Sequence, residues 1–148
     1  MNDELTPRMQ QEEPSTDLVQ TVFVYGTLKS GGQVRGLDMF GDHSEIQGKA
    51  KTEFPDYDMA DLGGFPAVVL GGEHYIEGEV WKVSQWLADK IDDMEGYPTF
   101  YNKKKVPTSQ GNAIMYFMDR ESVEQYNVLQ YDQTSSVEKI GDTLKWNL

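Results

Sequence analysis

Residues 21–28 read TVFVYGTL and are the most informative part of the chain. The run of β-branched and aromatic residues from Val22 to Tyr25 favours a buried strand over a helical turn. The run stops at Gly26, whose lack of a side chain permits unusual backbone torsions and the close approach of a ligand. Backbone N–H groups in such a turn can point outward together and donate to an anion. The stretch therefore predicts a strand that ends either in an anion-binding turn or in an ordinary corner between strand and loop.

Length and charge limit the classes of function. The chain has 148 residues, which suits one domain with one hydrophobic core. With 13 Lys and Arg residues against 25 Asp and Glu residues, the formal net charge is -12. This charge repels nucleic-acid phosphates and anionic lipids over most of the surface, so we expect neither a nucleic-acid nor a membrane partner. A local anion site remains compatible with it, because salt screens distant charges over about 8 Å.

Cysteine is absent from the sequence, which excludes disulfide bonds, thiol nucleophiles and thiolate metal sites. No apolar run approaches the ~20 residues that span a bilayer, and the first 19 residues lack the pattern of a secretion signal. We therefore expect a cytoplasmic protein. Residues 1–19 are rich in acidic and amide side chains and predict a flexible acidic tail. A short helix from Thr6, or an arm folded across a neighbour, is the alternative.

Four further apolar stretches have the length and composition of strands, at residues 67–70, 75–83, 100–106 and 113–118. Gly71 and Gly72 separate the first two stretches, so we expect these two to pair as an antiparallel hairpin. A turn at residues 110–112 separates the last two. The three lysines at 103–105 are expected along a solvated edge of the sheet rather than at a phosphate site.

One strong helical pattern begins after the capping residue Ser84 and stops at Gly96. Glu95 would be the last residue of this helix and would border its apolar stripe, with Asp92 on the flank. A carboxyl group beside apolar surface has a raised pKa, which suits proton transfer near neutral pH, so Glu95 is a candidate base. The alternative is a Glu95 side chain that extends into solvent or pairs with one of the lysines at 103–105.

Other chemistries find no support in the sequence. His43 and His74 are the only histidines and have no partner at metal-site spacing, so we expect both at the surface. No phosphate-binding loop, dinucleotide fingerprint or nucleophile-elbow serine is present. We therefore expect no metal ion and no cofactor.

Four segments carry a family resemblance when they are taken together and in order. They read VFVYGTLK at 22–29, FPAV at 65–68, EGEVW at 77–81 and IDDMEGYPTFY at 91–101. The set resembles the gamma-glutamylcyclotransferase-like family, especially its gamma-glutamylamine cyclotransferase branch, over about residues 21–118. The resemblance implies an α+β fold over residues 20–148, a small mixed β-barrel of about five to seven strands with flanking helices.

The resemblance also implies a site and an activity. Tyr25, Gly26, Thr27 and Leu28 would hold the substrate, Glu95 would be the general acid/base, and Tyr101 would lie beside the site. Lys103 stands where relatives commonly carry arginine, which puts the bidentate contacts of that arginine in question. The activity would be cyclisation of the gamma-glutamyl group of a gamma-glutamyl amine or peptide to 5-oxoproline, with release of the free amine and without a metal or cofactor.

Two alternatives stay open on the sequence. A non-catalytic module could sequester a small metabolite in the same cavity. An enzyme that removes a gamma-glutamyl protecting group in a biosynthetic pathway would differ from the first activity only in the leaving amine.

Overall fold

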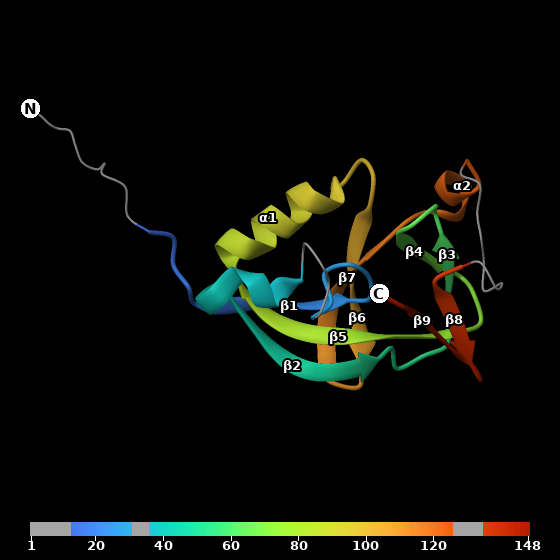
Figure 1. Cartoon of the computed structure of the whole chain (residues 1–148), viewed down its shortest axis with the longest axis horizontal. Helices are drawn as coiled ribbons and strands as arrows, with labels where there is room; N and C mark the ends of the chain where they lie inside the picture. The colour runs from blue at the N-terminus through green and yellow to red at the C-terminus, as the bar shows by residue number, and fades with distance from the viewer. Residues whose placement is uncertain (1–12, 31–35, 126–134) are drawn as a thin grey trace, which may run out of the picture.

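A curled seven-stranded sheet organises the part of the chain that the computed structural model describes, residues 13–30, 36–125 and 135–148 (Figure 1). Its strands are β1 (Leu18–Val24), β2 (Ser44–Lys51), β5 (Tyr75–Ser84), β6 (Asn102–Thr108), β7 (Gly111–Phe117), β8 (Val137–Ile140) and β9 (Thr143–Trp146). A two-stranded sheet consists of β3 (Tyr57–Asp61) and β4 (Pro66–Leu70). The helices are a 3-10 helix η1 (Leu37–His43), α1 (Gln85–Glu95) and α2 (Arg120–Val123).

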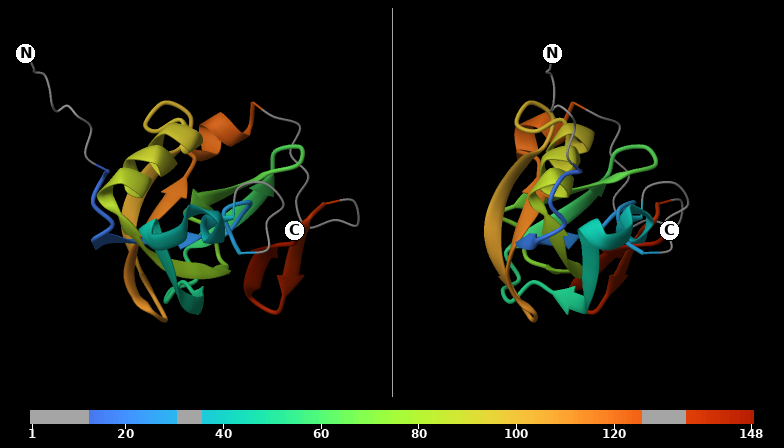
Figure 2. Two further views of the ribbon diagram at one scale, coloured as in Figure 1. Left: turned by 60° about the vertical axis from the view of Figure 1, so that its left-hand side comes forward. Right: turned by 90° about the vertical axis from the view of Figure 1, so that its left-hand side faces the viewer.

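The main sheet has the order β6-β7-β1-β5-β9-β8, and β2 pairs with β5 along the edge opposite β1, since both strands pair with residues 79–83 of β5. The sheet curls into a half-barrel, and α1 and the β8–β9 hairpin lie at different ends of it (Figures 1 and 2). Both parallel and antiparallel pairs occur, since β1 runs antiparallel to β5 and parallel to β7. The predicted α+β class, with a barrel-like mixed sheet and flanking helices, is confirmed.

The last three residues of β1 are buried, with side chains on both faces of the strand, which explains the unbroken apolar run there. Val22 and Val24 belong to the part of the core that includes the buried face of α1. Phe23 and Tyr25 belong to the second part of the core, on the opposite face of the strand. A strand between two covered faces needs apolar side chains in succession rather than in alternation. Because the end of β1 is held in the core, residues 26–28, which follow it, have a fixed position.

The predicted helix is confirmed, including its last residue. The Ser84 hydroxyl accepts a hydrogen bond from the Leu87 N–H at 3.1 Å, which caps the N-terminus of α1. Gly96 ends the helix with φ of 66°, in the left-handed region that favours glycine. Because both ends are fixed by local caps, the position of Glu95 at the end of α1 is fixed as well.

β6 and β7, the two strands predicted on either side of a turn at residues 110–112, pair as an antiparallel hairpin, with Gly111 and Asn112 already in β7, and β6 is an edge of the sheet. Lys104 and Lys105 are exposed there, as expected of a solvated edge, whereas Lys103 is half-buried.

The predicted hairpin across Gly71 and Gly72 is wrong. β4 pairs with β3, and β5 pairs with β1 and β2 instead. The N–H groups of both glycines donate to the carbonyl of Asp56 at 2.9 and 3.0 Å, and Tyr57 and His74 exchange two backbone hydrogen bonds. These hydrogen bonds hold the turn against the start of β3. β5 therefore does not fold back along β4 and does not pair with it.

Two smaller expectations also change. β1 begins at Leu18, so it includes the last two residues of the segment assigned to a tail, of which residues 1–12 lie outside the described residues. The prediction of surface histidines is wrong, because both are half-buried beside a polar partner. His43 Nδ1 lies 2.7 Å from Ser84 Oγ, and His74 Nδ1 lies 2.7 Å from Asp58 Oδ1.

Within the described ranges, no helix is long and apolar enough to cross a bilayer.

Candidate active site

A cavity of about 650 Å³ lies where the end of β1, the β3–β4 loop and the end of α1 meet. The residues that the sequence singled out as site residues all line this cavity: Tyr25, Gly26, Thr27, Leu28, Glu95 and Tyr101. Residues distant in sequence are therefore brought to one place.

The Glu79 carboxylate of β5 fixes the turn after β1 by hydrogen bonds to Ser30. The Lys29 N–H donates to the Gly26 carbonyl at 3.1 Å and closes the turn. The Ser30 N–H and hydroxyl each donate to Glu79 at 2.7 Å. Among the described residues, the N–H groups of Gly26, Thr27 and Leu28 have no acceptor. Since all three residues line the cavity, these N–H groups can donate to an anionic ligand.

Gly26 is required by close packing rather than by its torsion angles. A Cβ atom on Gly26 would lie 2.8 Å from Cγ and 3.2 Å from Cδ of Pro66. Its φ is not among the positive values that the described glycines adopt, so the expectation of unusual torsions is wrong. Pro66 also lines the cavity. Gly26 therefore lets the turn and the start of β4 approach closely enough to form one wall.

The hydroxyl groups of the two predicted tyrosines bind backbone atoms. The Tyr25 hydroxyl donates to the Tyr116 carbonyl at 2.8 Å and accepts from the Val68 N–H at 3.1 Å. The Tyr101 hydroxyl donates to the Pro66 carbonyl at 2.5 Å. Burial raises the pKa of Tyr25, and the nearby charge of Glu95 adds to this effect. Tyr25 thus remains a donor at neutral pH, and both hydroxyl groups join the strands that surround the cavity.

Glu95 is half-buried at the C-terminal end of α1. Its backbone carbonyl accepts a hydrogen bond from the Tyr101 N–H at 3.2 Å. Its carboxylate is close enough to raise the pKa of Tyr116 as well, although burial and a hydrogen bond to Asp92 contribute more. The cavity thus contains a carboxylate beside buried phenols.

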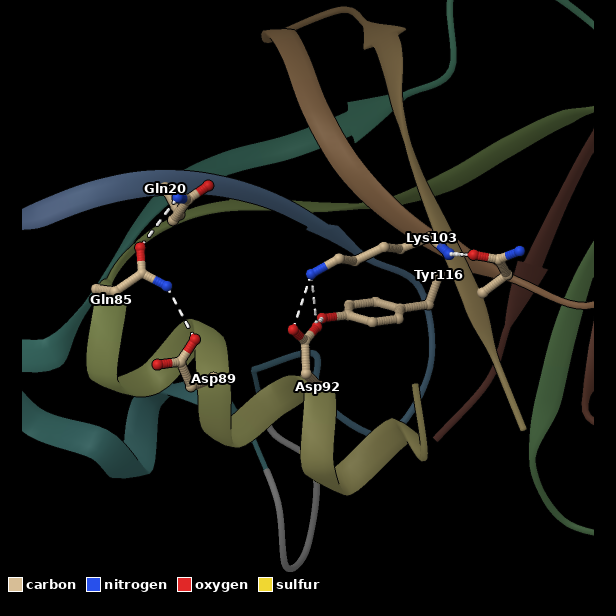
Figure 3. Close-up of polar contacts among 7 residues, drawn as sticks. Gln20, Gln85, Asp89, Asp92, Lys103 and Tyr116 are labelled. Atoms are coloured by element: carbon tan, nitrogen blue, oxygen red, sulfur yellow. Dashed lines mark hydrogen bonds and ion pairs between the residues drawn. The ribbon is translucent and has the colours of Figure 1, made fainter. Parts of the chain in front are cut away.

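Lys103, one of the lysines expected as alternative partners of Glu95, pairs with Asp92. The ammonium group of Lys103 contacts both carboxylate oxygens of Asp92, at 2.9 and 2.8 Å (Figure 3). The Tyr116 hydroxyl donates to the same carboxylate, and Lys103 Nζ lies 4.4 Å from the centre of the Tyr97 ring. A lysine can therefore contact both oxygens of one carboxylate at the position where relatives were expected to carry arginine. The network ties α1 to β6 and β7 one turn before Glu95.

The family model described as gamma-glutamyl cyclotransferase, AIG2-like, matches residues 22–135. The chain belongs to this family. It is 34% identical over 95 residues to a Vibrio cholerae protein provisionally named a gamma-glutamylcyclotransferase, covering 64% of this chain and 78% of that protein. It is 29% identical over 100 residues to the gamma-glutamylaminecyclotransferase of Bos taurus, covering 64% of this chain and 59% of that protein. The predicted family resemblance is thus confirmed.

Solved structures agree on the fold. An AIG2-like protein from Mus musculus superposes with a TM-score of 0.58 at 22% identity, covering 67% of this chain and 76% of that one. An uncharacterised protein from Pyrococcus horikoshii gives a TM-score of 0.54 at 24% identity, covering 67% and 77%. At these identities the superpositions show a shared fold and nothing about function.

The family motifs include two aromatic residues of the cavity whose role sequence reasoning missed. Phe65 precedes β4 and Phe100 follows α1, and both line the cavity. Trp146, Asn147 and Leu148 complete the lining from the C-terminal side. Nothing in their local sequence places them there, because the position of β9 depends on its pairing with β5.

A buried carboxylate that sequence reasoning also missed joins two walls of the cavity. Asp61 is 3% exposed and accepts hydrogen bonds from the Gly63 and Gly64 N–H groups at 2.9 and 3.0 Å. Its other oxygen accepts from the Ser135 hydroxyl at 3.1 Å and the Ser136 N–H at 3.2 Å. Burial alone would raise the pKa of Asp61, but these hydrogen bonds hold it below the usual value. Gly64 and Ser136 both line the cavity, so Asp61 is positioned to keep their segments together.

Proposed function

We propose that this protein cyclises the gamma-glutamyl group of a gamma-glutamyl amine or peptide to 5-oxoproline and releases the free amine. The observation that carries the proposal is one cavity lined both by Glu95 and by the unpaired N–H groups of residues 26–28. This cyclisation needs a proton acceptor and a cluster of hydrogen-bond donors that can bind an anion. Family membership supports the same class of reaction.

The nucleophile is supplied by the substrate. Its α-amino nitrogen attacks the γ-carbonyl carbon, so that a C–N bond closes a five-membered lactam and the C–N bond to the leaving amine breaks. Because both reacting groups belong to one molecule, holding the substrate in a folded conformation removes much of the entropic barrier. The cavity walls formed by Tyr25, Pro66 and Tyr101 would hold that conformation.

Glu95 would move the proton. The α-ammonium group first loses one proton to solvent, which frees the lone pair of its nitrogen. As this nitrogen attacks, the Glu95 carboxylate takes a second proton from it and returns that proton to the leaving nitrogen as the C–N bond breaks, so that the free amine departs. The N–H groups of Gly26, Thr27 and Leu28 would bind the α-carboxylate or the oxyanion that develops on the γ-carbonyl. The substrate-binding role of Tyr25 and Tyr101 would lie in their rings, since their hydroxyls hold the backbone.

Product analysis tests the proposal directly. We expect incubation with a panel of gamma-glutamyl-lysine, gamma-glutamyl-alanine, glutathione and simple gamma-glutamyl amides to give 5-oxoproline and free amine in equal amounts, measured by mass spectrometry. Absence of the lactam across the whole panel would contradict the proposal. A panel member that raises the melting temperature but is recovered unchanged would favour the binding-module alternative.

Gly26→Val tests the role of the turn. The new Cβ would lie within 3 Å of Pro66, which moves a cavity wall and should abolish binding with Glu95 intact. Overpacking of this kind also lowers the free energy of unfolding, by about 1 to 3 kcal/mol. The measurement is the thermal-shift response to an accepted substrate, with circular dichroism to establish that the variant is folded. If the folded variant still binds and turns over that substrate, the turn is not a wall of the binding site.

A further inference from the structure

Two aromatic side chains that line the same cavity as Glu95 are not fully buried. Phe100 is 39% exposed and Phe65 is half-buried, and their ring centres lie 6.1 Å apart. They come from two separate segments, the bend before β4 and the segment after α1. Exposed aromatic surface that lines a cavity is typical of a binding surface for an apolar group.

The backbone places Phe100 on the side of the cavity where the leaving group must lie. The Phe100 N–H donates to the Gly96 carbonyl at 2.7 Å, and the Tyr101 N–H donates to the Glu95 carbonyl at 3.2 Å. The chain thus folds back onto the end of α1. In the proposed reaction Glu95 must reach the leaving nitrogen to protonate it, so the substituent on that nitrogen lies close to Glu95. Its surroundings there include Met94, Phe65 and Phe100.

The cavity is larger than a gamma-glutamyl group requires. Its volume of about 650 Å³ falls in the range of sites that enclose drug-sized ligands. A substituent of the size of an aromatic ring can therefore be accommodated beside the glutamyl moiety.

The charges near the cavity do not favour an anionic leaving group. None of the described residues that line it is a lysine, arginine or histidine. Lys29, next to the turn, donates to the Trp146 carbonyl at 2.6 Å, and Lys103 pairs with Asp92 at 2.8 Å. A leaving amino acid or peptide carries a carboxylate, which needs a counter-charge or donors when it is desolvated. Neither lysine is placed to provide that counter-charge.

A cationic leaving group meets a different difficulty. The described lining residues contain one acidic side chain, Glu95, and the proposed reaction uses it for proton transfer. A second ammonium group on the leaving amine would compete for that carboxylate.

We propose that the leaving amine carries an uncharged, apolar substituent, as in benzylamine or a branched alkylamine, and that this substituent binds against Phe65 and Phe100. This inference rests on the proposed cyclotransferase function and names its substrate class.

The test compares four gamma-glutamyl substrates that differ only in the leaving group: the benzylamide, the methylamide, the glycine peptide and the ε-lysine isopeptide. We expect kcat/KM for the benzylamide to exceed each of the others about tenfold or more, the range that apolar contacts give in an enzyme pocket. Equal or faster turnover of the glycine or lysine substrate would overturn the inference while leaving the cyclotransferase function intact. No 5-oxoproline from any of the four would contradict the function itself, and the inference with it.

Substitution of the two phenylalanines tests whether the preference for the benzylamide arises from their side chains. Phe100→Ala and Phe65→Ala should each bring the ratio of kcat/KM for benzylamide over methylamide toward one. Phe54→Ala is the matched control, because Phe54 is 53% exposed and is not among the lining residues. We expect the control to keep the parental ratio. An unchanged ratio in folded Phe100→Ala and Phe65→Ala would overturn the assignment of the leaving-group substituent to these two side chains. If a variant does not fold, the four-substrate comparison on the parent protein still tests the substrate class.

Discussion

Glu95→Gln is expected to lower the rate of 5-oxoproline release by a factor of about 10² to 10⁴, the usual contribution of a positioned acid/base. An amide of the same size cannot take the proton that the attacking nitrogen loses as the lactam forms. The fold should be unchanged, because glutamine keeps the size of the side chain and leaves the Gly96 cap and the hydrogen bond from the Tyr101 N–H to the Glu95 carbonyl in place. The measurement is kcat by mass spectrometry together with a melting curve.

Asp93→Asn provides a matched control on the same turn of α1. Asp93 is exposed and is not among the lining residues, so the same change from carboxylate to amide should leave activity near that of the parent. If Glu95→Gln keeps more than about a tenth of the parental kcat, the acid/base contribution expected of Glu95 is absent. The proposed mechanism would then need another proton acceptor.

The parts of this site that the sequence predicts are those fixed by short-range signals. The Ser84 cap and the Gly96 stop define α1 from its own residues, and the helical spacing then puts Glu95 at the border of the apolar stripe. The end of β1 is likewise read from a run of apolar residues followed by glycine. Family motifs then link the helix to the turn, and the cavity brings the two together.

The parts that could not be predicted depend on contacts between distant segments. Gly71 and Gly72 indicate a hairpin locally, yet bonds to Asp56 turn the chain around β3. Helical spacing put Asp92 on the flank of the helix, but its partners Lys103 and Tyr116 come from β6 and β7. No periodicity within one element identifies a partner on another.

Asp61→Ala is expected to lower the free energy of unfolding by about 2 to 4 kcal/mol at pH 7, since hydrogen bonds to a charged group contribute about 1.5 to 3 kcal/mol each and are not additive. The four donors, on Gly63, Gly64, Ser135 and Ser136, lose their common acceptor in a site that is 3% exposed. We also expect a higher KM, because Gly64 and Ser136 line the cavity. Urea unfolding and initial-rate kinetics measure the two effects.

The pH dependence separates the charge of Asp61 from its shape. The pKa of Asp61 in the folded protein lies below its ordinary value of 3.8, so the carboxylate contributes stability that is fully present above that value. This contribution is lost as the pH falls through the lower, folded-state pKa. The stability difference between the parent and Asp61→Asn should therefore be largest near neutral pH and shrink below about pH 4.

Asp142→Asn is the control for this comparison, because Asp142 is an exposed aspartate in the turn between β8 and β9. Its stability difference from the parent should be small at every pH, since changes at exposed positions are usually within about 0.5 kcal/mol. A difference for Asp61→Asn that stays constant between pH 7 and pH 3 would mean that the ionised carboxylate does not hold the two cavity walls together. In that case the charge of Asp61 would not matter to the two cavity walls, and protonation of the parent at low pH should not reproduce the effects of Asp61→Ala.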